Sequence, residues 1–116
     1  MKKIIAAALL SFSLNSFADN APLWLRFCSI SPDGQTIAFS YKGDLFSVPV
    51  NGGIAKQLTT NPAYDAYPIW SPDGQKIAFA STREGSMDIY LMNKNGGVPK
   101  RLTTNSGSEI PMAFTD

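Results

Sequence analysis

Short apolar runs of five to eight residues, separated by polar clusters that contain glycine or proline, recur along the chain after residue 18. Many of these runs alternate apolar with polar positions and are rich in β-branched and aromatic residues, as half-buried strands are. No helical periodicity of useful length follows residue 18, so the pattern predicts an all-β protein. The predicted strands are 23–30, 35–41, 44–50, 54–59, 66–70, 75–80, 88–93 and 98–103.

The polar clusters between these runs have the chemistry of tight turns. Ser-Pro-Asp-Gly occurs at 31–34 and again at 71–74. In this phrase Pro presets φ, Asp bonds nearby backbone and Gly takes the left-handed conformation, so each copy fits a type I turn that opens a hairpin. Asn-Gly-Gly at 51–53 and 95–97 is a second hairpin signal, since Asn and Gly both tolerate positive φ.

The two sets of four strands are copies of one repeat. The Ser-Pro-Asp-Gly phrases lie 40 residues apart and the Asn-Gly-Gly phrases 44 apart, because 41–43 in the first unit becomes the longer loop 81–87 in the second. Four short strands in about 40 to 45 residues is the blade spacing of a β-propeller. We therefore predict a signal peptide at 1–18, blade 1 at 19–65, blade 2 at 66–109 and the first strand of a truncated third blade at 110–116.

A propeller blade has two faces to cover, and a closed ring usually needs four to eight blades. The 116 residues supply two blades and the start of another. Exposed blade faces and edges are an aggregation liability. We therefore expect the chain to be the amino-terminal part of a longer protein, in which the remaining blades and downstream domains are its partners.

The first eighteen residues have the layout of a signal peptide. Lys2 and Lys3 precede an apolar run at 4–14, and Ser-Phe-Ala at 16–18 offers small residues to a signal peptidase. The run is too short for a membrane span, which needs about twenty residues. We expect export to the periplasm or the medium, with no membrane span in the mature chain.

Composition narrows the class of partner. Ten basic residues less Lys2 and Lys3 leave eight against nine acidic residues, and no basic stripe of the kind that nucleic acids require is present. Cys28 is the only cysteine, so no intrachain disulfide can form, and its apolar surroundings in the sequence predict a buried, inert thiol. Peptides or proteins are the expected ligands, and nucleic acid is not.

The repeat phrases resemble the WD-like propeller repeats of TolB and tricorn-type proteins. They comprise the Ser-Pro-Asp-Gly turns, the Ile-Ala-Phe runs that follow them, Asp-Ile-Tyr at 88–90 and Lys-Arg-Leu-Thr at 100–103. A signal segment that leads straight into Pro-Leu-Trp-Leu-Arg at 22–26 resembles the start of an exported bacterial tricorn-type serine peptidase. TolB-type proteins carry an α/β domain ahead of the propeller, for which this chain has no room.

The resemblance implies a propeller that sorts or channels peptides for a Ser, His and Glu peptidase core in later domains. This chain has no histidine, so it holds no Ser–His pair and no catalytic residue is carried over. Two positions depart from the repeat: Ile30 stands where the blade has Trp70, and Thr115 replaces the turn serine. The alternatives are a TolB-like periplasmic binding or scaffold propeller and the propeller of a prolyl-oligopeptidase-type hydrolase.

The turn and strand carboxylates are expected to be structural rather than catalytic or metal-binding. Asp33 and Asp73 each sit third in a tight turn with no second carboxylate nearby in the sequence. Asp44 and Asp88 recur at the repeat period where the third strand of each unit begins, which favours a bond to loop backbone. No nucleotide-binding loop or Cys/His cluster is present, so we expect no cofactor-binding, metal-binding or catalytic residue.

Three further sets of residues have an ordinary structural interpretation. Arg83 and Glu84 in the long loop are expected to form a solvated ion pair, with peptide contact as the alternative. Tyr64 and Tyr67 are expected to pack between adjacent blades, and Trp70 is expected in the core. The charges of the fourth strands, expected to discourage edge pairing, are Lys56, Lys100 and Arg101.

Overall fold

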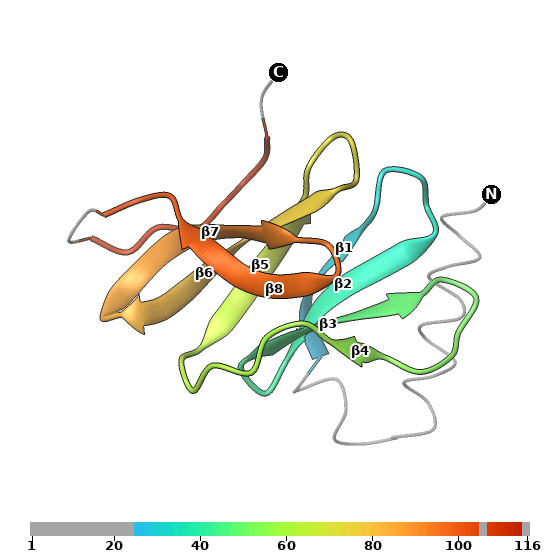
Figure 1. Cartoon of the computed structure of the whole chain (residues 1–116), viewed down its shortest axis with the longest axis horizontal. Coiled ribbons are helices and arrows are strands. Elements are labelled where there is room, and N and C mark those ends of the chain that lie inside the picture. The colour runs from blue at the N-terminus through green and yellow to red at the C-terminus, as the bar shows by residue number, and fades with distance from the viewer. Residues whose placement is uncertain (1–24, 105–106, 115–116) are drawn as a thin grey trace.

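Two antiparallel sheets, each with its four strands in chain order, contain all the strands of the described residues (Figure 1). The structure is a computed structural model that describes residues 25–104 and 107–114. The first sheet comprises β1 (Leu25–Ile30), β2 (Thr36–Tyr41), β3 (Asp44–Pro49) and β4 (Lys56–Gln57), and the second comprises β5 (Asp65–Trp70), β6 (Lys76–Glu84), β7 (Ser86–Asn93) and β8 (Gly96–Arg101). The all-β prediction of two four-stranded antiparallel sheets is confirmed. The predicted signal peptide at 1–18 and the third turn at 115–116 lie outside the described residues.

Two strand predictions differ from the structure. Strand β4 contains only two residues, Lys56 and Gln57, whereas its equivalent β8 has six, and Ile54 ahead of β4 is 92% exposed. The predicted loop at 81–87 is instead an extension of the hairpin between β6 and β7. The two strands pair out to Glu84 and Ser86, and Gly85, with φ of 109°, makes the turn.

The two Ser-Pro-Asp-Gly turns have the same hydrogen bonds. The Ser31 hydroxyl donates to Asp33 Oδ1 at 2.6 Å and accepts from the Thr36 N–H at 3.0 Å. Asp33 Oδ1 also accepts from the Gln35 N–H at 3.0 Å. In the second turn the three corresponding distances are 2.7, 3.0 and 3.0 Å. Asp33 and Asp73 therefore have the turn role that the sequence predicts, and the same three hydrogen bonds close the turn of each hairpin.

The main core lies between the two sheets, which stand side by side in Figure 1. Burial of a large apolar side chain contributes about 1.5–3 kcal/mol, so this contact is the principal stabilisation between the sheets. Trp70 is only half-buried and packs against the edge of this core rather than inside it. The core residues are Ala38, Leu45 and Leu58 from the first sheet and Ile77, Phe79, Tyr90 and Met92 from the second.

Equivalent positions of the repeat show what a neighbouring sheet does. Leu58 and Leu102 occupy the same place in the two units, yet Leu58 is 6% exposed and Leu102 is 47% exposed. The second sheet covers Leu58, and no described residue covers Leu102 in the same way. On the opposite face, Tyr90 is 5% exposed whereas its equivalent Phe46 is only half-buried. Burial at these positions is therefore conferred by the adjacent sheet and not by the strand itself.

The first strands of the two sheets, β1 and β5, lie against each other. Each contains a β-bulge, and the bulge residues Phe27 and Tyr67 have positive φ values of 54° and 58°. Their rings pack with centroids 4.0 Å apart, which confirms that Tyr67 packs between the units. The bulge follows from no feature of the apolar run. It places Cys28 at an exposed position, so the prediction of a buried thiol is wrong.

Residues 107–114 begin to repeat the path of the chain into the second sheet. The N–H of Asp65 donates to the carbonyl of Gly43 at 2.8 Å. Forty-four residues later, the N–H of Glu109 donates to the carbonyl of Met87 at 2.7 Å. No strand is assigned within 107–114, but this backbone bond supports the repeat register of a third unit.

The half-covered faces generate the first prediction. We expect the isolated chain 19–116 to self-associate or to melt without cooperativity, because Phe46, Leu102 and their neighbours stay in contact with water. Light scattering combined with a thermal melt followed by circular dichroism measures both properties. A sharp two-state transition from a monodisperse monomer is the result that contradicts this prediction.

Candidate functional site

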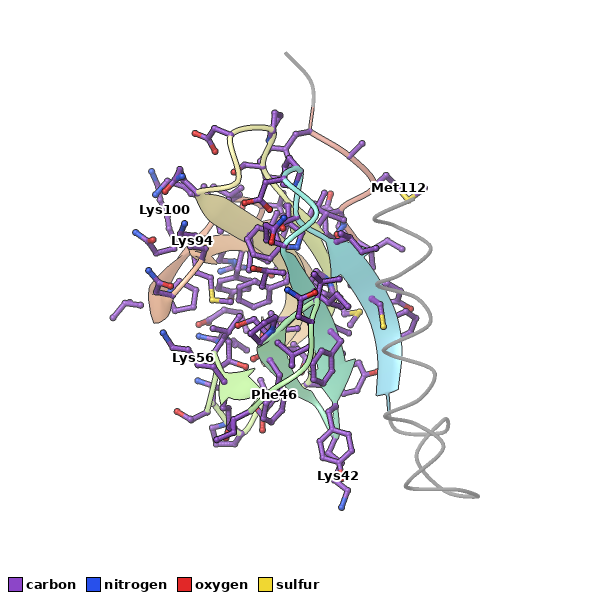
Figure 2. The ribbon with its side chains drawn as sticks, turned by 90° about the vertical axis from the view of Figure 1, so that its right-hand side faces the viewer. Lys42, Phe46, Lys56, Lys94, Lys100 and Met112 are labelled. Atoms are coloured by element: carbon purple, nitrogen blue, oxygen red, sulfur yellow. The ribbon has the colours of Figure 1, made fainter. Side chains whose placement is uncertain are left out.

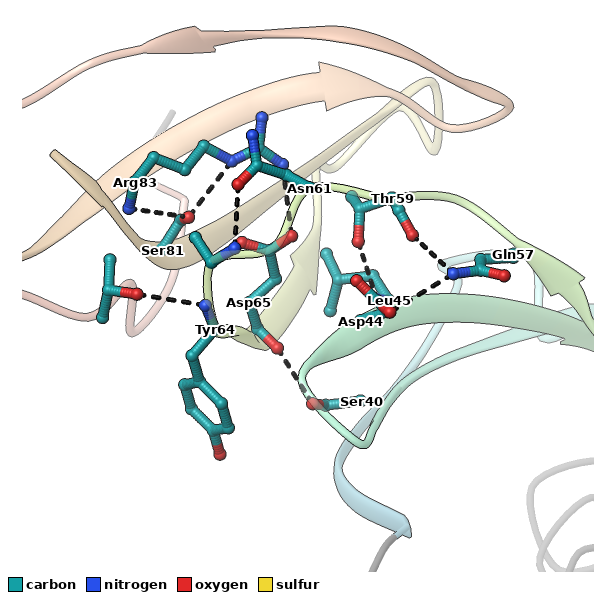
Figure 3. Close-up of polar contacts among 12 residues, drawn as sticks. Ser40, Asp44, Leu45, Gln57, Thr59, Asn61, Tyr64, Asp65, Ser81 and Arg83 are labelled. Carbon is teal, nitrogen blue, oxygen red and sulfur yellow. Dashed lines mark hydrogen bonds and ion pairs between the residues drawn. The ribbon is translucent and has the colours of Figure 1, made fainter.

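The contact between the two sheets, here called the seam, is pinned by polar bonds as well as by the apolar core. At one end of the seam the Ser40 hydroxyl donates to the carbonyl of Asp65 at 3.0 Å (Figure 3). The Asp65 N–H in turn donates to the carbonyl of Gly43. At the other end the indole N–H of Trp70 donates to the carbonyl of Ser29 at 3.0 Å. These bonds fix the position of β5 relative to the first sheet.

A buried ion pair lies at the first end of the seam. Arg83 Nη2 is 3.1 Å from Asp65 Oδ2, and the Asp65 side chain is 0% exposed. The Arg83 Nε donates to the Ser81 hydroxyl at 3.1 Å, and the guanidinium lies 5.6 Å from the Phe79 ring centroid and 5.4 Å from that of Tyr90. Carboxylate, hydroxyl and aromatic rings thus hold Arg83 on several sides. The expected solvated pair with Glu84 is not the one that forms.

The long hairpin explains this pairing. Asp65 is the cross-strand partner of Ser81, and Arg83 lies two positions beyond Ser81 in β6. The pairing with β7 shifts register between Ser81 and Glu84, yet Arg83 lies over the rings of Phe79 and Tyr90, which belong to the core between the sheets. The corresponding hairpin of the first sheet turns at Lys42 and Gly43, so it has no residue equivalent to Arg83.

The end of each sheet carries a repeated threonine bond. Thr59 Oγ1 accepts from the Leu45 N–H at 2.9 Å, and Thr103 Oγ1 accepts from the Ile89 N–H at 2.9 Å. This bond ties the chain that leaves the fourth strand back to the third. The Leu-Thr-Thr phrase at 58–60 and 102–104 therefore has a structural role in both units.

Asp44 and Asp88 occupy equivalent positions but have different partners. Asp88, fully buried, accepts from Arg101 Nη2 at 2.7 Å. Asp44 has no arginine partner and accepts from the neutral amide of Gln57 at 3.3 Å and from the side chain of Thr59. The expected bond from these carboxylates to loop backbone is therefore replaced by a side-chain bond to the fourth strand. Arg101, expected as an outward edge charge, is half-buried in this pair.

The surroundings of these carboxylates set their pKa values. Partial burial raises the pKa of Asp44 above its ordinary value of 3.8, and the nearby charge of Asp65 raises it further. In the turns, hydrogen bonds lower the pKa: chiefly the Ser31 hydroxyl for Asp33 and the Gln75 N–H for Asp73. Both turn carboxylates are therefore ionised at neutral pH.

The remaining predicted residues lie at the surface. Tyr64 is 43% exposed, and its N–H donates to Thr82 Oγ1 at 3.0 Å, so its backbone rather than its ring connects to β6. Lys56 and Lys100 are exposed on β4 and β8, the outermost strands, where the sequence places them. Among residues 25–104 and 107–114, no group of three or more Asp, Glu and Cys side chains is arranged to hold a metal ion.

The seam contains little that supports bond-making chemistry. Both buried carboxylates, Asp65 and Asp88, face an arginine, which neutralises them in place. Sequence reasoning missed the Asp65–Arg83 pair. No signal in the sequence identifies it, because the two residues are eighteen positions apart and meet only through the pairing of β5 with β6.

The comparisons with known proteins agree with this architecture. Residues 22–116 match the model of the Tricorn protease N-terminal beta propeller domain. This chain belongs to that family. This chain is 37% identical over 71 residues to "Tricorn protease homolog 1" of Streptomyces coelicolor, and the match covers 61% of this chain and 6% of that protein. It is also 32% identical over 71 residues to "Dipeptidyl-peptidase 5" of Porphyromonas gingivalis, covering 53% of this chain and 10% of that protein.

Solved structures resemble this chain over about seventy per cent of its length. The TolB structure from Acinetobacter baumannii has a TM-score of 0.61 at 30% identity and covers 71% of this chain and 22% of that one. The crystal structure of the tricorn protease has a TM-score of 0.60 at 28% identity and covers 69% of this chain and 8% of that one. The two sheets are therefore propeller blades. The described residues contain no helix long and apolar enough to cross a membrane.

The substitution of Arg83 tests the buried ion pair that it forms with Asp65. Arg83→Met leaves the Asp65 carboxylate buried without its cation, and we expect a loss of about 3 kcal/mol in the free energy of unfolding. The matched control is Glu84→Gln on the exposed neighbour, which should stay within about 0.5 kcal/mol of the parent. Because the isolated chain is not expected to unfold in a two-state transition, urea denaturation of the full-length protein compares the two variants, and equal losses contradict the assigned pairing.

Asp44 and Asp88 stand at equivalent positions, yet their substitution by asparagine is expected to change the free energy of unfolding in opposite directions. Asp88→Asn breaks a pair with half-exposed Arg101, and we expect a loss of about 2 kcal/mol at pH 7. Asp44→Asn removes a carboxylate whose charged form is disfavoured on folding, so it should raise stability by less than about 1 kcal/mol.

The effect of Asp44→Asn depends on pH in a defined direction. The folded pKa of Asp44 is raised, so ionisation costs stability above that pKa, and the cost disappears as the pH falls through it to below 3.8. The advantage of Asp44→Asn should therefore shrink in acid. Urea midpoints measured across this range test the sign, and a destabilised variant at pH 7 contradicts it.

Proposed function

We propose that this chain is the amino-terminal propeller segment of an exported tricorn-like serine peptidase, where it admits or recognises peptide substrates and supplies no catalytic residue. The observation that carries the proposal is the match of residues 22–116 to the Tricorn N-terminal propeller domain, on a chain without histidine. The two first strands, β1 and β5, lie side by side, as the strands nearest a propeller axis do. A peptide that passes along this axis would meet them first.

The chain spans 6% and 10% of the two curated relatives described above, so the activity of a whole protein is part of the proposal. In that protein we place the catalytic core outside these residues and the other blades against the two half-covered faces. The basic and apolar segments of 1–18 support export to the periplasm or the medium.

Two other functions have an observation in their favour. The likeness to the Acinetobacter TolB structure favours a periplasmic binding or scaffold propeller. The likeness to the Porphyromonas dipeptidyl-peptidase favours a propeller ahead of a prolyl-oligopeptidase-type hydrolase domain. The sequence beyond residue 116 discriminates between them: a Gly-x-Ser-x-Gly elbow indicates the hydrolase, and a propeller with no peptidase domain indicates the scaffold.

Cys28 provides the test of peptide admission. Its thiol is exposed on β1, and partial burial raises its pKa, so it should react with a bulky maleimide slowly but completely. In the full-length protein with its other thiols replaced by serine, we expect this modification to slow hydrolysis of long peptides severalfold and to leave a small chromogenic substrate unaffected.

Two controls define the outcome. Cys28→Ser should make the protein insensitive to the reagent, and chain 19–116 alone should hydrolyse neither substrate. If modification slows both substrates equally, or neither, β1 does not line the route of the peptide. Hydrolysis by chain 19–116 after rigorous purification would contradict the placement of the catalytic residues outside it.

A further inference from the structure

A shallow groove lies over the seam on the side of the Ser-Pro-Asp-Gly turns. It consists of two adjoining hollows of about 150 and 320 Å³ that share Thr36, Trp70 and Lys94 in their walls. The first hollow lies between the two turns, and the second extends outward along β3 toward β4. Both blades contribute to the groove, so it exists only where two blades meet.

The charges along the groove are separated. Asp33 and Asp73 line the first hollow, and both are ionised at neutral pH because turn hydrogen bonds lower their pKa values. Lys56 lines the second hollow, and Lys94 stands at the junction. Figure 2 shows Lys56 and Lys94 on the same side of the molecule. Lys94 lines both hollows, so the inner hollow holds two carboxylates and one ammonium group, whereas the outer hollow holds the two lysines and no carboxylate.

Apolar surface lies between and beside these charges. The half-buried indole of Trp70 lines both hollows with its N–H already donated to Ser29, so the aromatic ring contributes apolar rather than hydrogen-bonding surface. Ile54, 92% exposed, and Val48 line the outer hollow. The outer hollow therefore combines apolar surface with two lysines, although the exposure of Ile54 itself is shared by its repeat equivalent Val98, which is 95% exposed outside the groove.

Lys94 is also the position where the second unit departs from the first. Its equivalent in blade 1 is Val50, which is 8% exposed and packs with Ile37 and Phe39. The backbone bond is the same in both units: Val50 N–H to Gln35 and Lys94 N–H to Gln75. The second unit therefore has a partly buried lysine at a place where the first unit has a buried valine. Local departures from a consistent pattern mark functional positions.

We propose that this groove binds an extended peptide segment that carries an ammonium group at one end and a carboxylate at the other. The ammonium group lies between Asp33 and Asp73, and the carboxylate meets Lys94 and Lys56. An apolar side chain between them packs on Trp70 and Ile54. The charge order of the groove favours this occupant over a nucleic acid or a uniformly acidic chain, which the two aspartates would repel.

The inference rests on the proposed role in peptide handling but concerns a site other than β1. The terminal groups of a short peptide, or a lysine and a glutamate side chain within a longer one, supply the same two charges. Four peptides separate these sources: Ala-Ala-Phe-Ala-Ala with free termini, the same peptide with both termini blocked, blocked Lys-Ala-Phe-Ala-Glu, and blocked Gln-Ala-Phe-Ala-Gln.

Isothermal titration of the full-length protein, with its peptidase serine covalently inhibited, measures the affinities. We expect the free and the Lys/Glu peptides to bind about tenfold tighter than the two neutral blocked ones, and the difference to fall as salt is added. If only the free peptide gains, the groove reads chain termini; if only the Lys/Glu peptide gains, it reads side chains. Equal binding of charged and neutral peptides, or no binding, overturns the proposal.

Three variants localise the binding to the groove. Lys94→Gln and Lys56→Gln should each weaken binding of the charged peptides about three- to fivefold, the effect of one exposed ion pair. The matched control is Lys100→Gln, which removes the same charge from the repeat equivalent of Lys56, on β8 and outside the groove. Circular dichroism verifies that each variant is folded. An equal loss from Lys100→Gln shows general attraction and overturns the proposed site.

Separate failures are distinguishable. The Cys28 experiment reads the passage of long peptides, whereas the titration reads equilibrium binding with hydrolysis blocked. If the titration fails and Cys28 modification still slows long peptides, the proposed function stands without the groove. If Cys28 modification has no effect and the lysine variants weaken binding, the groove stands on a propeller with a binding or scaffold role.

Discussion

A four-stranded sheet with apolar residues on both faces must be covered on both, and this constraint organises the whole molecule. Leu45 and Phe79 are buried because two such sheets press against each other, whereas the faces that point outward remain half-covered. The dominant stabilisation is therefore contact between units. Each unit supplies half of a core, and the core becomes complete only at the boundary with the next unit.

Polar bonds give this contact its geometry. The Asp65–Arg83 pair is costly to desolvate, so its net contribution to the free energy of folding is modest. Removal of Arg83 alone is nevertheless costly, because it leaves the Asp65 carboxylate buried without a cation. The pair joins β5 to β6 inside the second sheet, and the Ser40 and Trp70 bonds, which cross to the first sheet, fix the position of one blade against the other. Apolar side chains alone would tolerate a sliding contact, whereas directional bonds at both ends of the seam select one register.

The sequence was sufficient to predict features that repeat and insufficient for those that arise where two repeats meet. The strands and turns follow from local chemistry, so the roles of Asp33 and Asp73 could be predicted from four residues each. The partner of Arg83 could not, because it lies eighteen positions away and is reached only through the cross-strand register. The exposure of Cys28 depends on a bulge that an apolar run does not reveal. The groove beside Lys94 needs both sheets in place.

The paired aromatic residues of the two bulges have a consequence for the symmetry of the propeller. Phe27 and Tyr67 share a left-handed backbone that bulky residues rarely adopt, and the contact between their tilted rings accompanies this strain. The residue in the third such place is Pro111, whose ring fixes φ near −65° and forbids the left-handed conformation. An equivalent left-handed residue is therefore excluded at position 111. The repeat changes between the second and third units at the position where the first two units contact each other.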